Sequence, residues 1–184
     1  MLHRLPNFRT DEERSRYNDA IVKPFYRSEE DYDWTQAADR CVGLESVMHR
    51  LRERTMLSML RTYGRGEPML DVGCGSGLHL RHMPEGSTGI DVNPRNVVRS
   101  CHYAPQATVI EGDAEHLPFP DQSFHTIVCT EVLEHVVYPE RVIAEILRVL
   151  KPGGMFFGSV PRASWLWHLR STLSRTCPAD EPFH

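Results

Sequence analysis

The sequence predicts a doubly wound α/β domain, in which helices cover both faces of a mainly parallel sheet. Short apolar segments alternate with segments of helical character, and a glycine-rich turn directly follows the first apolar segment. Because a helix separates each expected strand from the next, the strands are expected to run parallel. The expected strands are residues 68–72, 87–91, 107–111, 124–129 and 155–160.

Helices are expected on either side of these strands. Apolar side chains recur at i, i+3, i+4 and i+7 from Leu44 onward, and this spacing predicts an amphipathic helix that ends at Gly64. A second helix is expected near residues 78–83, and a third opens at Pro94, because proline is favoured at the first helical position. Residues 139–150 predict a further helix with one apolar face.

Composition narrows the class of protein. The chain has 184 residues, 40% of them hydrophobic, which suits one domain with a core, and its net charge of −4 argues against stable nucleic-acid binding. Neither a membrane-spanning segment nor a signal peptide is expected, because no apolar run is long enough and the N-terminus is polar. The five cysteines are scattered without a C-x-x-C pair, so we expect no disulfide framework, no metal site and a reduced, cytoplasmic protein.

The segment LDVGCGSG at residues 70–77 points to a ligand. Gly73, Gly75 and Gly77 would permit positive φ angles or a close approach of a ligand to the backbone. In doubly wound sheets, ligands bind beyond the carboxyl ends of the strands, and the turn after the first strand lies there. The helix expected next would direct free N–H groups at an anionic group. Asp91, at the end of the second strand, is placed to accept hydrogen bonds from both hydroxyls of a ribose.

Two ligand classes fit this turn. The dinucleotide fingerprint is G-x-G-x-x-G, whereas this chain reads G-x-G-x-G. Asp71, beside the turn, would repel a pyrophosphate and attract an ammonium group. S-adenosylmethionine carries an α-amino group, so it fits better than NAD. From these residues alone, a glycine-rich turn that binds no ligand stays open.

Two further segments carry a resemblance to a known family. GDAEHLPFPDQSFHTIVCTEVLEHV at residues 112–136 and RVLKPGG at residues 148–154 resemble the class I S-adenosylmethionine-dependent methyltransferases. The most similar branch methylates small molecules, lipids and quinone precursors. The resemblance covers roughly residues 44–160. It implies a Rossmann-like fold, with S-adenosylmethionine as the cofactor and S-adenosylhomocysteine as the product.

The resemblance also implies a cofactor site built from the loops that follow four strands. Its residues would be Asp71, Gly73, Cys74, Gly75 and Gly77 around the methionine part, Asp91 at the ribose, Val92 as an apolar face for the adenine, Asp113 and Ala114 at the adenine amine and ring nitrogen, and Thr130 and Glu131 on the methionine and sulfonium side. Taken alone, Asp113 also fits a residue that caps its loop, and Cys74 fits a small buried residue.

Methyl transfer is an in-line displacement at a carbon that the sulfonium activates, so the protein mainly positions the acceptor and excludes water. A general base is needed only if the acceptor must lose a proton. His135, in the segment after the fourth strand, is the candidate base, and the alternative is that it caps or packs this segment. The expected acceptor is a small molecule or lipid-like compound, methylated on oxygen rather than nitrogen or carbon.

The ends of the chain carry separate expectations. The expected parts are a lid or helical extension at residues 1–43, the methyltransferase domain at 44–160 and a basic, aromatic segment at 161–184. Tyr26, Tyr32 and Trp34 would let the lid contact an acceptor, and the alternative is a disordered tail. The last part contains a basic, tryptophan-bearing helical pattern that would lie on a membrane interface, dock on the domain or line the acceptor pocket.

Two departures from the family pattern bear on function. His125 stands where the family usually has aspartate, and we expect it to support its strand. Residues 161–184 leave little room for the last strands of the family's seven-stranded sheet, so we expect a fragment or an early-ended chain. Residues 155–160 would then be an apolar edge strand, open to pairing in a homo-oligomer. The alternative functions are a truncated, non-catalytic S-adenosylmethionine-binding module that scaffolds or activates a partner and an NAD-dependent oxidoreductase, which the glycine spacing and Asp71 disfavour.

Overall fold

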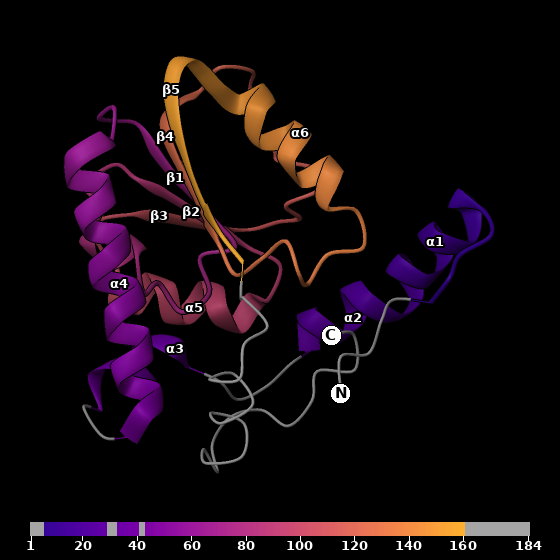
Figure 1. The fold of residues 1–184 in the computed structure, drawn as a ribbon, viewed down its shortest axis with the longest axis horizontal. Coiled ribbons are helices and arrows are strands. Elements are labelled where there is room, and N and C mark those ends of the chain that lie inside the picture. Colours follow the sequence, from indigo (N-terminus) through magenta and orange to yellow (C-terminus); the bar gives the residue numbers. More distant parts are fainter. Residues whose placement is uncertain (1–5, 29–32, 41–42, 161–184) are drawn as a thin grey trace.

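The computed structural model describes residues 6–28, 33–40 and 43–160, and its centre is a five-stranded parallel sheet (Figure 1). The strands are β1 (Met69–Val72), β2 (Thr88–Asp91), β3 (Thr108–Glu111), β4 (Phe124–Thr130) and β5 (Leu150–Ser159). They lie in the order β3-β2-β1-β4-β5, so the strand order reverses between β1 and β4. The predicted doubly wound α/β sheet is confirmed.

Helices cover both faces of this sheet (Figure 1). The long helix α4 (Gly43–Tyr63) and α5 (Pro94–Tyr103) lie on one face, and α6 (Pro139–Val149) lies on the other. As predicted, α5 opens at Pro94, and the side chain of Asn93 caps it by accepting a hydrogen bond from the Arg95 N–H at 2.9 Å.

The helix predicted near residues 78–83 is wrong. Only a 3₁₀ turn, η2 (Leu80–His82), forms there. Gly77 has a φ of +91°, so a helix can begin only after it. At the other end, Met83 precedes Pro84 and is extended, with a ψ of 156°, because proline disfavours the helical conformation in the residue before it. A short turn is all that fits between these two positions.

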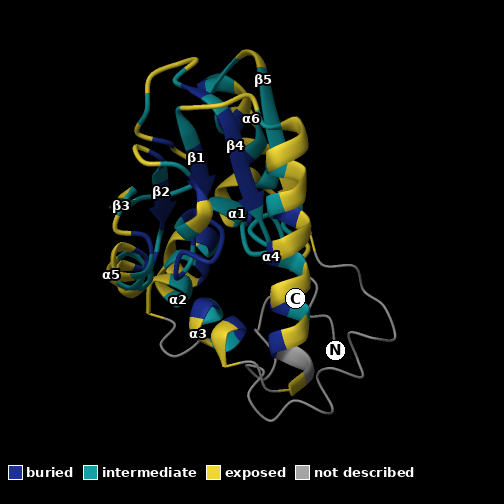
Figure 2. Ribbon diagram, turned by 90° about the vertical axis from the view of Figure 1, so that its left-hand side faces the viewer, coloured by how far each residue is buried: buried dark blue, intermediate teal, exposed yellow. Residues whose placement is uncertain are grey.

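The core has one apolar cluster on each face of the sheet, and Figure 2 shows the buried residues following the central strands. The cluster under α6 contains Leu70, Val72, Ile90, Leu117, Phe124, Ile127, Cys129, Val142, Ile146 and Val149. The cluster on the α4 side contains Met56, Cys74, Leu80, Met83, Ala104, Val128 and Phe157. Because both faces are covered, the strand ends are left as the place for a ligand.

The N-terminal segment, residues 6–28 and 33–40, is mostly helical. It contains α1 (Asp11–Tyr17), the π turn η1 (Asn18–Val22), α2 (Lys23–Ser28) and α3 (Trp34–Asp39). Figure 1 shows these helices at the end of the sheet where the strands terminate. Tyr32 and the basic pattern within residues 161–184 lie outside the described residues.

Two further observations concern the sheet edge and the family departure. In the described part of the chain, β5 is an edge strand, as predicted for residues 155–160. His125 lies in β4 with its Nε2 3.3 Å from Nζ of Lys151, and its backbone N–H donates to the carbonyl of Pro68. These contacts suit the structural role expected of this histidine.

None of the helices in the described ranges has the length and apolar character needed to cross a membrane.

Candidate active site

The glycine turn after β1 lies at the point where the strand order reverses. Gly73 has a φ of +68°, and a Cβ there would come within 2.3 Å of Cγ2 of Val132, in the loop after β4. A side chain is therefore excluded both by the backbone conformation and by the neighbouring loop. At Gly77 a Cβ would lie 2.8 Å from Oγ of Ser100, so this glycine lets α5 pack against the turn.

Asp91, at the end of β2, holds the turn in place. Its surface is 8% exposed, and its Oδ2 accepts a hydrogen bond from the Gly75 N–H at 2.8 Å. Its Oδ1 accepts hydrogen bonds from the N–H of Asn93 at 2.9 Å and from the side-chain amide of Asn96 at 3.2 Å. Burial raises the pKa of Asp91, although these hydrogen bonds lower it. The three hydrogen bonds occupy three of the about four lone-pair sites of the Asp91 carboxylate, which leaves one site for a ribose hydroxyl in this arrangement. The ribose contact stays a prediction.

Asp71, in β1, is the most unusual group of the site. It is 1% exposed and lies between β2 and β4, opposite Gly89 and Val128. Among the described residues, its Oδ2 has no hydrogen-bond partner. Burial raises the pKa of Asp71 from 3.8 to about 8, and the negative charge of Asp91 adds to this effect.

An ammonium group near the turn would stabilise the ionised form of Asp71, whereas a pyrophosphate would destabilise it further. The turn, with its bare backbone and buried carboxylates, therefore fits S-adenosylmethionine better than a dinucleotide.

Asp113 follows β3 and has two protein partners. The N–H of Glu115 donates to its Oδ1 at 2.9 Å, and Nζ of Lys23 lies 2.8 Å from its Oδ2. Asp113 thus caps its loop, as the alternative interpretation had it, and also binds α2. Ala114 is half-buried and packs against the core cluster under α6. Their contacts with an adenine stay predictions.

Glu131, directly after β4, has a φ of +55°, which is uncommon for a residue with a side chain. Two neighbours fix it: its N–H donates to the Ser159 carbonyl at 3.0 Å, and its Oε1 accepts from the Ser159 hydroxyl at 2.9 Å. Its Oε2 lies 2.9 Å from the guanidinium of Arg52, in α4. The loop after β4 is therefore tied to both β5 and α4, at the rim where the methionine part is predicted to bind.

Thr130 brings an unexpected residue into the site. Its Oγ1 lies 3.4 Å from Nδ1 of His79, which is not among the predicted site residues. His79 is 9% exposed, and in the described part of the chain its Nε2 has no hydrogen-bond partner. Burial lowers the pKa of His79 to about 4, so the imidazole is neutral near pH 7. No periodicity or motif distinguishes this histidine, so the sequence gives no signal for it.

His135 lies in the loop after β4, with 24% of its side chain exposed. The hydroxyl of Tyr26, from α2, is 3.0 Å from its Nδ1, and the two rings meet edge to face with centroids 5.2 Å apart. Its Nε2 is 3.8 Å from Oε1 of Glu134. This arrangement suits a packed histidine and equally a base oriented by its neighbours, so the role of His135 stays a prediction.

Two of the predicted residues have mainly local contacts. Cys74 is 6% exposed and packs in the core cluster on the α4 side, with its Sγ 3.9 Å from the Gly75 carbonyl. Burial raises the pKa of its thiol, so it is a neutral core residue whose backbone belongs to the turn. Val92 is half-buried directly after Asp91, where it would meet an adenine.

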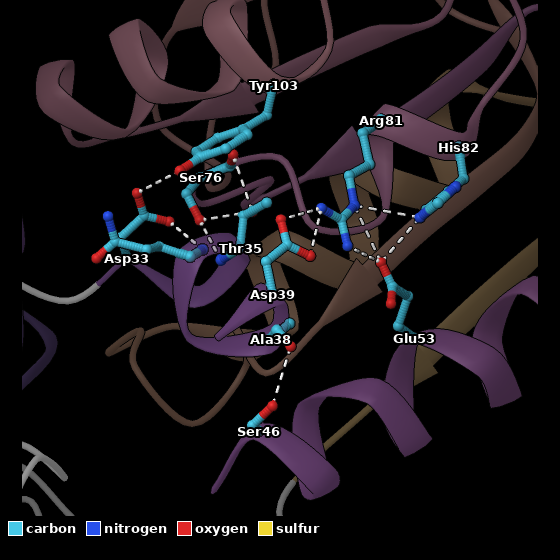
Figure 3. A network of polar contacts seen from close by, with 11 residues as sticks. Asp33, Thr35, Ala38, Asp39, Ser46, Glu53, Ser76, Arg81, His82 and Tyr103 are labelled. Carbon is cyan, nitrogen blue, oxygen red and sulfur yellow. Dashed lines mark hydrogen bonds and ion pairs between the residues drawn. The ribbon is translucent and has the colours of Figure 1, made fainter. Parts of the chain in front are cut away.

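Helix α3 docks directly on the glycine turn (Figure 3). Thr35 is fully buried: its N–H donates to Oγ of Ser76 at 3.0 Å, and its Oγ1 lies 2.9 Å from Oγ and 3.2 Å from the carbonyl oxygen of Ser76. Beside it, Cδ1 of Trp34 lies 3.5 Å from where a Cβ on Gly75 would be. The N-terminal segment therefore contacts the same bare backbone that was predicted to meet a ligand.

A second network in Figure 3 anchors α3 to its surroundings. The Arg81 guanidinium lies 2.9 Å from Asp39 of α3 and 2.6 Å from Glu53 of α4, and Glu53 also contacts His82 at 2.8 Å. Because Arg81 and His82 belong to η2, the turn after the glycines links α3 and α4. The short turn thus serves as a polar junction between helices.

A parallel sheet in the order β3-β2-β1-β4-β5, with a glycine turn after β1 and buried acidic residues in β1 and at the end of β2, matches the Rossmann-like fold of methyltransferases. Residues 70–158 match the sequence model of a family described as "Methyltransferase domain". Together, the match and the fold show that this part of the chain is a class I S-adenosylmethionine-dependent methyltransferase domain. S-adenosylmethionine is the methyl donor that this family implies.

Curated relatives match over about half of the chain. The phthiotriol/phenolphthiotriol dimycocerosates methyltransferase of Mycobacterium tuberculosis is 35% identical over 98 residues, which are 50% of this chain and 36% of that protein. The sterol 24-C-methyltransferase of Yarrowia lipolytica is 38% identical over 101 residues, which are 50% of this chain and 26% of that protein. The chain therefore spans well under half the length of these relatives.

Solved structures share the fold. A S-adenosylmethionine-dependent methyltransferase of Thermotoga maritima superposes with a TM-score of 0.57 at 23% identity, over 76% of this chain and 68% of that chain. The [4+2]-cyclase SpnF gives a TM-score of 0.52 at 30% identity, over 59% and 44% of the two chains. Since these proteins are named for different reactions, the fold does not by itself name the reaction of this chain.

Proposed function

We propose that this chain transfers a methyl group from S-adenosylmethionine to a small-molecule or lipid-like acceptor and releases S-adenosylhomocysteine. The observation that carries this proposal is the buried Oδ2 of Asp71, which has no partner among the described residues and lies beside a glycine turn in a methyltransferase domain. A carboxylate so placed is stabilised by a cationic ligand and is costly without one.

The cofactor would supply the activated methyl group, and the residues of this chain would bind and orient it. Asp71 would balance the charge of the α-ammonium, and the backbone at Gly73, Gly75 and Gly77 would leave space for the methionine part. Asp91 would hold the ribose. The remaining proposed contacts are Val92, Asp113 and Ala114 around the adenine, and Thr130 and Glu131 on the sulfonium side.

The acceptor class is supported by the relatives, which are named for lipid and sterol methylation. We propose oxygen as the acceptor atom, with His135 removing its proton. The base would be oriented by Tyr26 at Nδ1 and stabilised as an imidazolium by Glu134. If the acceptor atom is instead a carbon or an amine that carries no proton to lose, His135 acts only in packing.

The N-terminal segment is proposed as a lid over this site, because Thr35, Tyr26 and Lys23 all contact loops at the strand ends. The thiols of Cys74 and Cys129 are buried and free, in keeping with the proposed reduced, cytoplasmic setting. The edge of β5, which no strand of the described ranges covers, remains the proposed site for pairing in a homo-oligomer.

Calorimetric titration of S-adenosylhomocysteine and of NAD into the chain tests the cofactor. We expect saturable binding of S-adenosylhomocysteine alone, lost in Asp91→Ala and kept in Asp121→Ala, whose side chain is 74% exposed. Transfer of a radiolabelled methyl group to hydroxylated lipids then tests the reaction. Cofactor binding without transfer to any acceptor would favour the non-catalytic module, and absence of binding would refute the proposal.

A further inference from the structure

The N-terminal segment contacts the loop that follows each of the first four strands. Thr35 bonds Ser76 after β1, and the carbonyl of Tyr26 accepts a hydrogen bond from Nδ2 of Asn93 after β2 at 3.0 Å. Contacts to Asp113 after β3 and to His135 after β4 complete the set. A cofactor at these strand ends would therefore share its protein contacts with this segment.

One of these contacts involves a group that the cofactor would also use. Nζ of Lys23 lies 2.8 Å from Oδ2 of Asp113, and the two side chains are 28% and 26% exposed. Burial lowers the pKa of Lys23, but the hydrogen bond and charge of Asp113, together with Glu115 and Asp19, outweigh this effect, so the pKa of Lys23 lies above its ordinary value. Lys23 is therefore a charged donor at neutral pH.

Neighbouring contacts hold Lys23 in this position. One helical turn or so before it, Nδ2 of Asn18 donates to Oε1 of Glu115 at 3.0 Å, and both of these side chains are buried. After it, Tyr26 is bonded through its carbonyl to Asn93 and through its hydroxyl to His135. Because the chain is held before Lys23, in η1, and after it, in α2, the ammonium is directed at Asp113 and is more than a freely moving surface charge.

We propose that Lys23 competes with the adenine amino group for Asp113 and so lowers the affinity of the chain for its cofactor. The proposal rests on the proposed function, in which Asp113 accepts a hydrogen bond from the adenine amine. Ammonium and amine are both donors, and Oδ1 of Asp113 is already bonded to the Glu115 N–H. A second donor on Oδ2 bonds less strongly, because the ammonium already compensates the charge of that oxygen.

The test compares the S-adenosylhomocysteine affinities of variants of the whole 184-residue chain by calorimetry. Lys23→Met removes the competing ammonium and is expected to bind about two- to fivefold more tightly than the wild type. Arg27→Met is the matched control: it removes one positive charge from the same helix, and its partner is Glu111 at 3.9 Å. The control is expected to bind as the wild type does, and Lys23→Arg to bind no more tightly than the wild type.

A ligand variant makes the test specific for the amine. With the analogue in which unsubstituted purine replaces adenine, the gain in Lys23→Met is expected to vanish, because no amine then competes for Asp113. Thermal denaturation of each variant shows whether its fold is intact. The gain is also expected to shrink in 0.5 M salt, because mobile ions screen the partly exposed ion pair.

The proposal is overturned if Lys23→Met binds S-adenosylhomocysteine no more tightly than the wild type, or if it gains equally for both ligands. In these cases the wild type still binds S-adenosylhomocysteine, and the proposed function stands. Failure of the wild type and of every variant to bind would instead refute the proposed function, and the competition with it.

Discussion

Replacing Asp71 by asparagine is expected to stabilise the protein at high pH. Asparagine has nearly the same shape as aspartate but carries no charge, so the substitution removes the cost of a buried carboxylate while keeping the packing in β1. In the folded wild type the pKa of Asp71 is raised from 3.8 to about 8, first by burial and then by the charge of Asp91.

The direction of the pH dependence follows from this raised pKa. The folded protein keeps a proton on Asp71 that the unfolded chain releases near pH 4, so this group favours folding below that pH. Its contribution is lost progressively as the pH rises towards about 8. The interval is about four pH units, and at ~1.4 kcal/mol for each the loss is at most ~6 kcal/mol. That limit is comparable with the whole stability of many domains, at about 5–15 kcal/mol.

Urea denaturation of wild type and Asp71→Asn at pH 5, 6.5, 8 and 9 measures this effect. The difference in unfolding free energy between the two proteins is expected to grow in favour of Asp71→Asn up to about pH 8 and then to level off. Other titrating groups cancel in the difference. Asp121→Asn, at an exposed position, serves as the control and is expected to show no such trend.

The reasoning would be refuted by a stability difference that stays constant across this pH range, because the carboxylate would then titrate alike in the folded and unfolded states. A second measurement links the result to function. S-adenosylhomocysteine at about 100 times the dissociation constant of the wild type is expected to stabilise the wild type by ~2.7 kcal/mol. At the same concentration we expect a smaller gain in unfolding free energy for Asp71→Asn, because asparagine cannot balance the ammonium charge of the ligand.

Three further substitutions separate packing, docking and chemistry. Gly73→Ala is expected to destabilise the protein by ~2–4 kcal/mol in thermal denaturation, because the positive φ strains an alanine backbone and the new Cβ clashes with Val132. Gly153→Ala is the control: it has a φ of +74° but no atom within 4 Å of the new Cβ, so it measures the backbone strain alone, at ~1 kcal/mol. Thr35→Val removes the two contacts of the Thr35 hydroxyl with Ser76, although the backbone N–H of residue 35 can still donate to Oγ of Ser76. It is expected to speed proteolysis within residues 1–40, and S-adenosylhomocysteine is expected to slow this cleavage in the wild type; equal rates with and without ligand would contradict the lid. His135→Gln is expected to lower kcat by about 10²-fold or more with a hydroxyl acceptor and to leave cofactor affinity unchanged, and full turnover would eliminate the base.

Local signals in the sequence were sufficient for most of the fold. The helix at Pro94 was predicted because proline is favoured at the first helical position, and the structure adds Asn93 as its cap. The strands were predicted from short apolar runs, since a parallel sheet buried on both faces requires them. The helix expected near residues 78–83 does not form, and one local signal points to this outcome, because Pro84 disfavours the helical conformation in the residue before it.

The contacts of the N-terminal segment were beyond local signals. Thr35 and Ser76 are 41 positions apart, and Asn18 and Glu115 are 97 apart. Each pair is joined by a single polar side chain on either side, which leaves no periodic trace in the sequence. The lid could be proposed from its aromatic residues, whereas the position of Lys23 on Asp113 required the structure.

Mutations are expected to act differently in the sheet, which local sequence signals predicted, and in the contacts of the N-terminal segment, which only the structure revealed. Residues of the sheet, such as Val72 or Ile127, are fully buried in a shared cluster, so their replacement affects folding and ligand binding together. Lys23 and Asp113 are about one-quarter exposed, and Lys23 forms ion pairs only with Asp113 and with the exposed Asp19 among the described residues. Changing Lys23 therefore alters little of the fold but frees a carboxylate at the proposed adenine end of the site. If Lys23 competes for Asp113 as proposed, cofactor affinity is adjustable through the N-terminal segment without disturbing the core, and variation in this segment among proteins with this sheet is expected to change ligand binding before it changes stability.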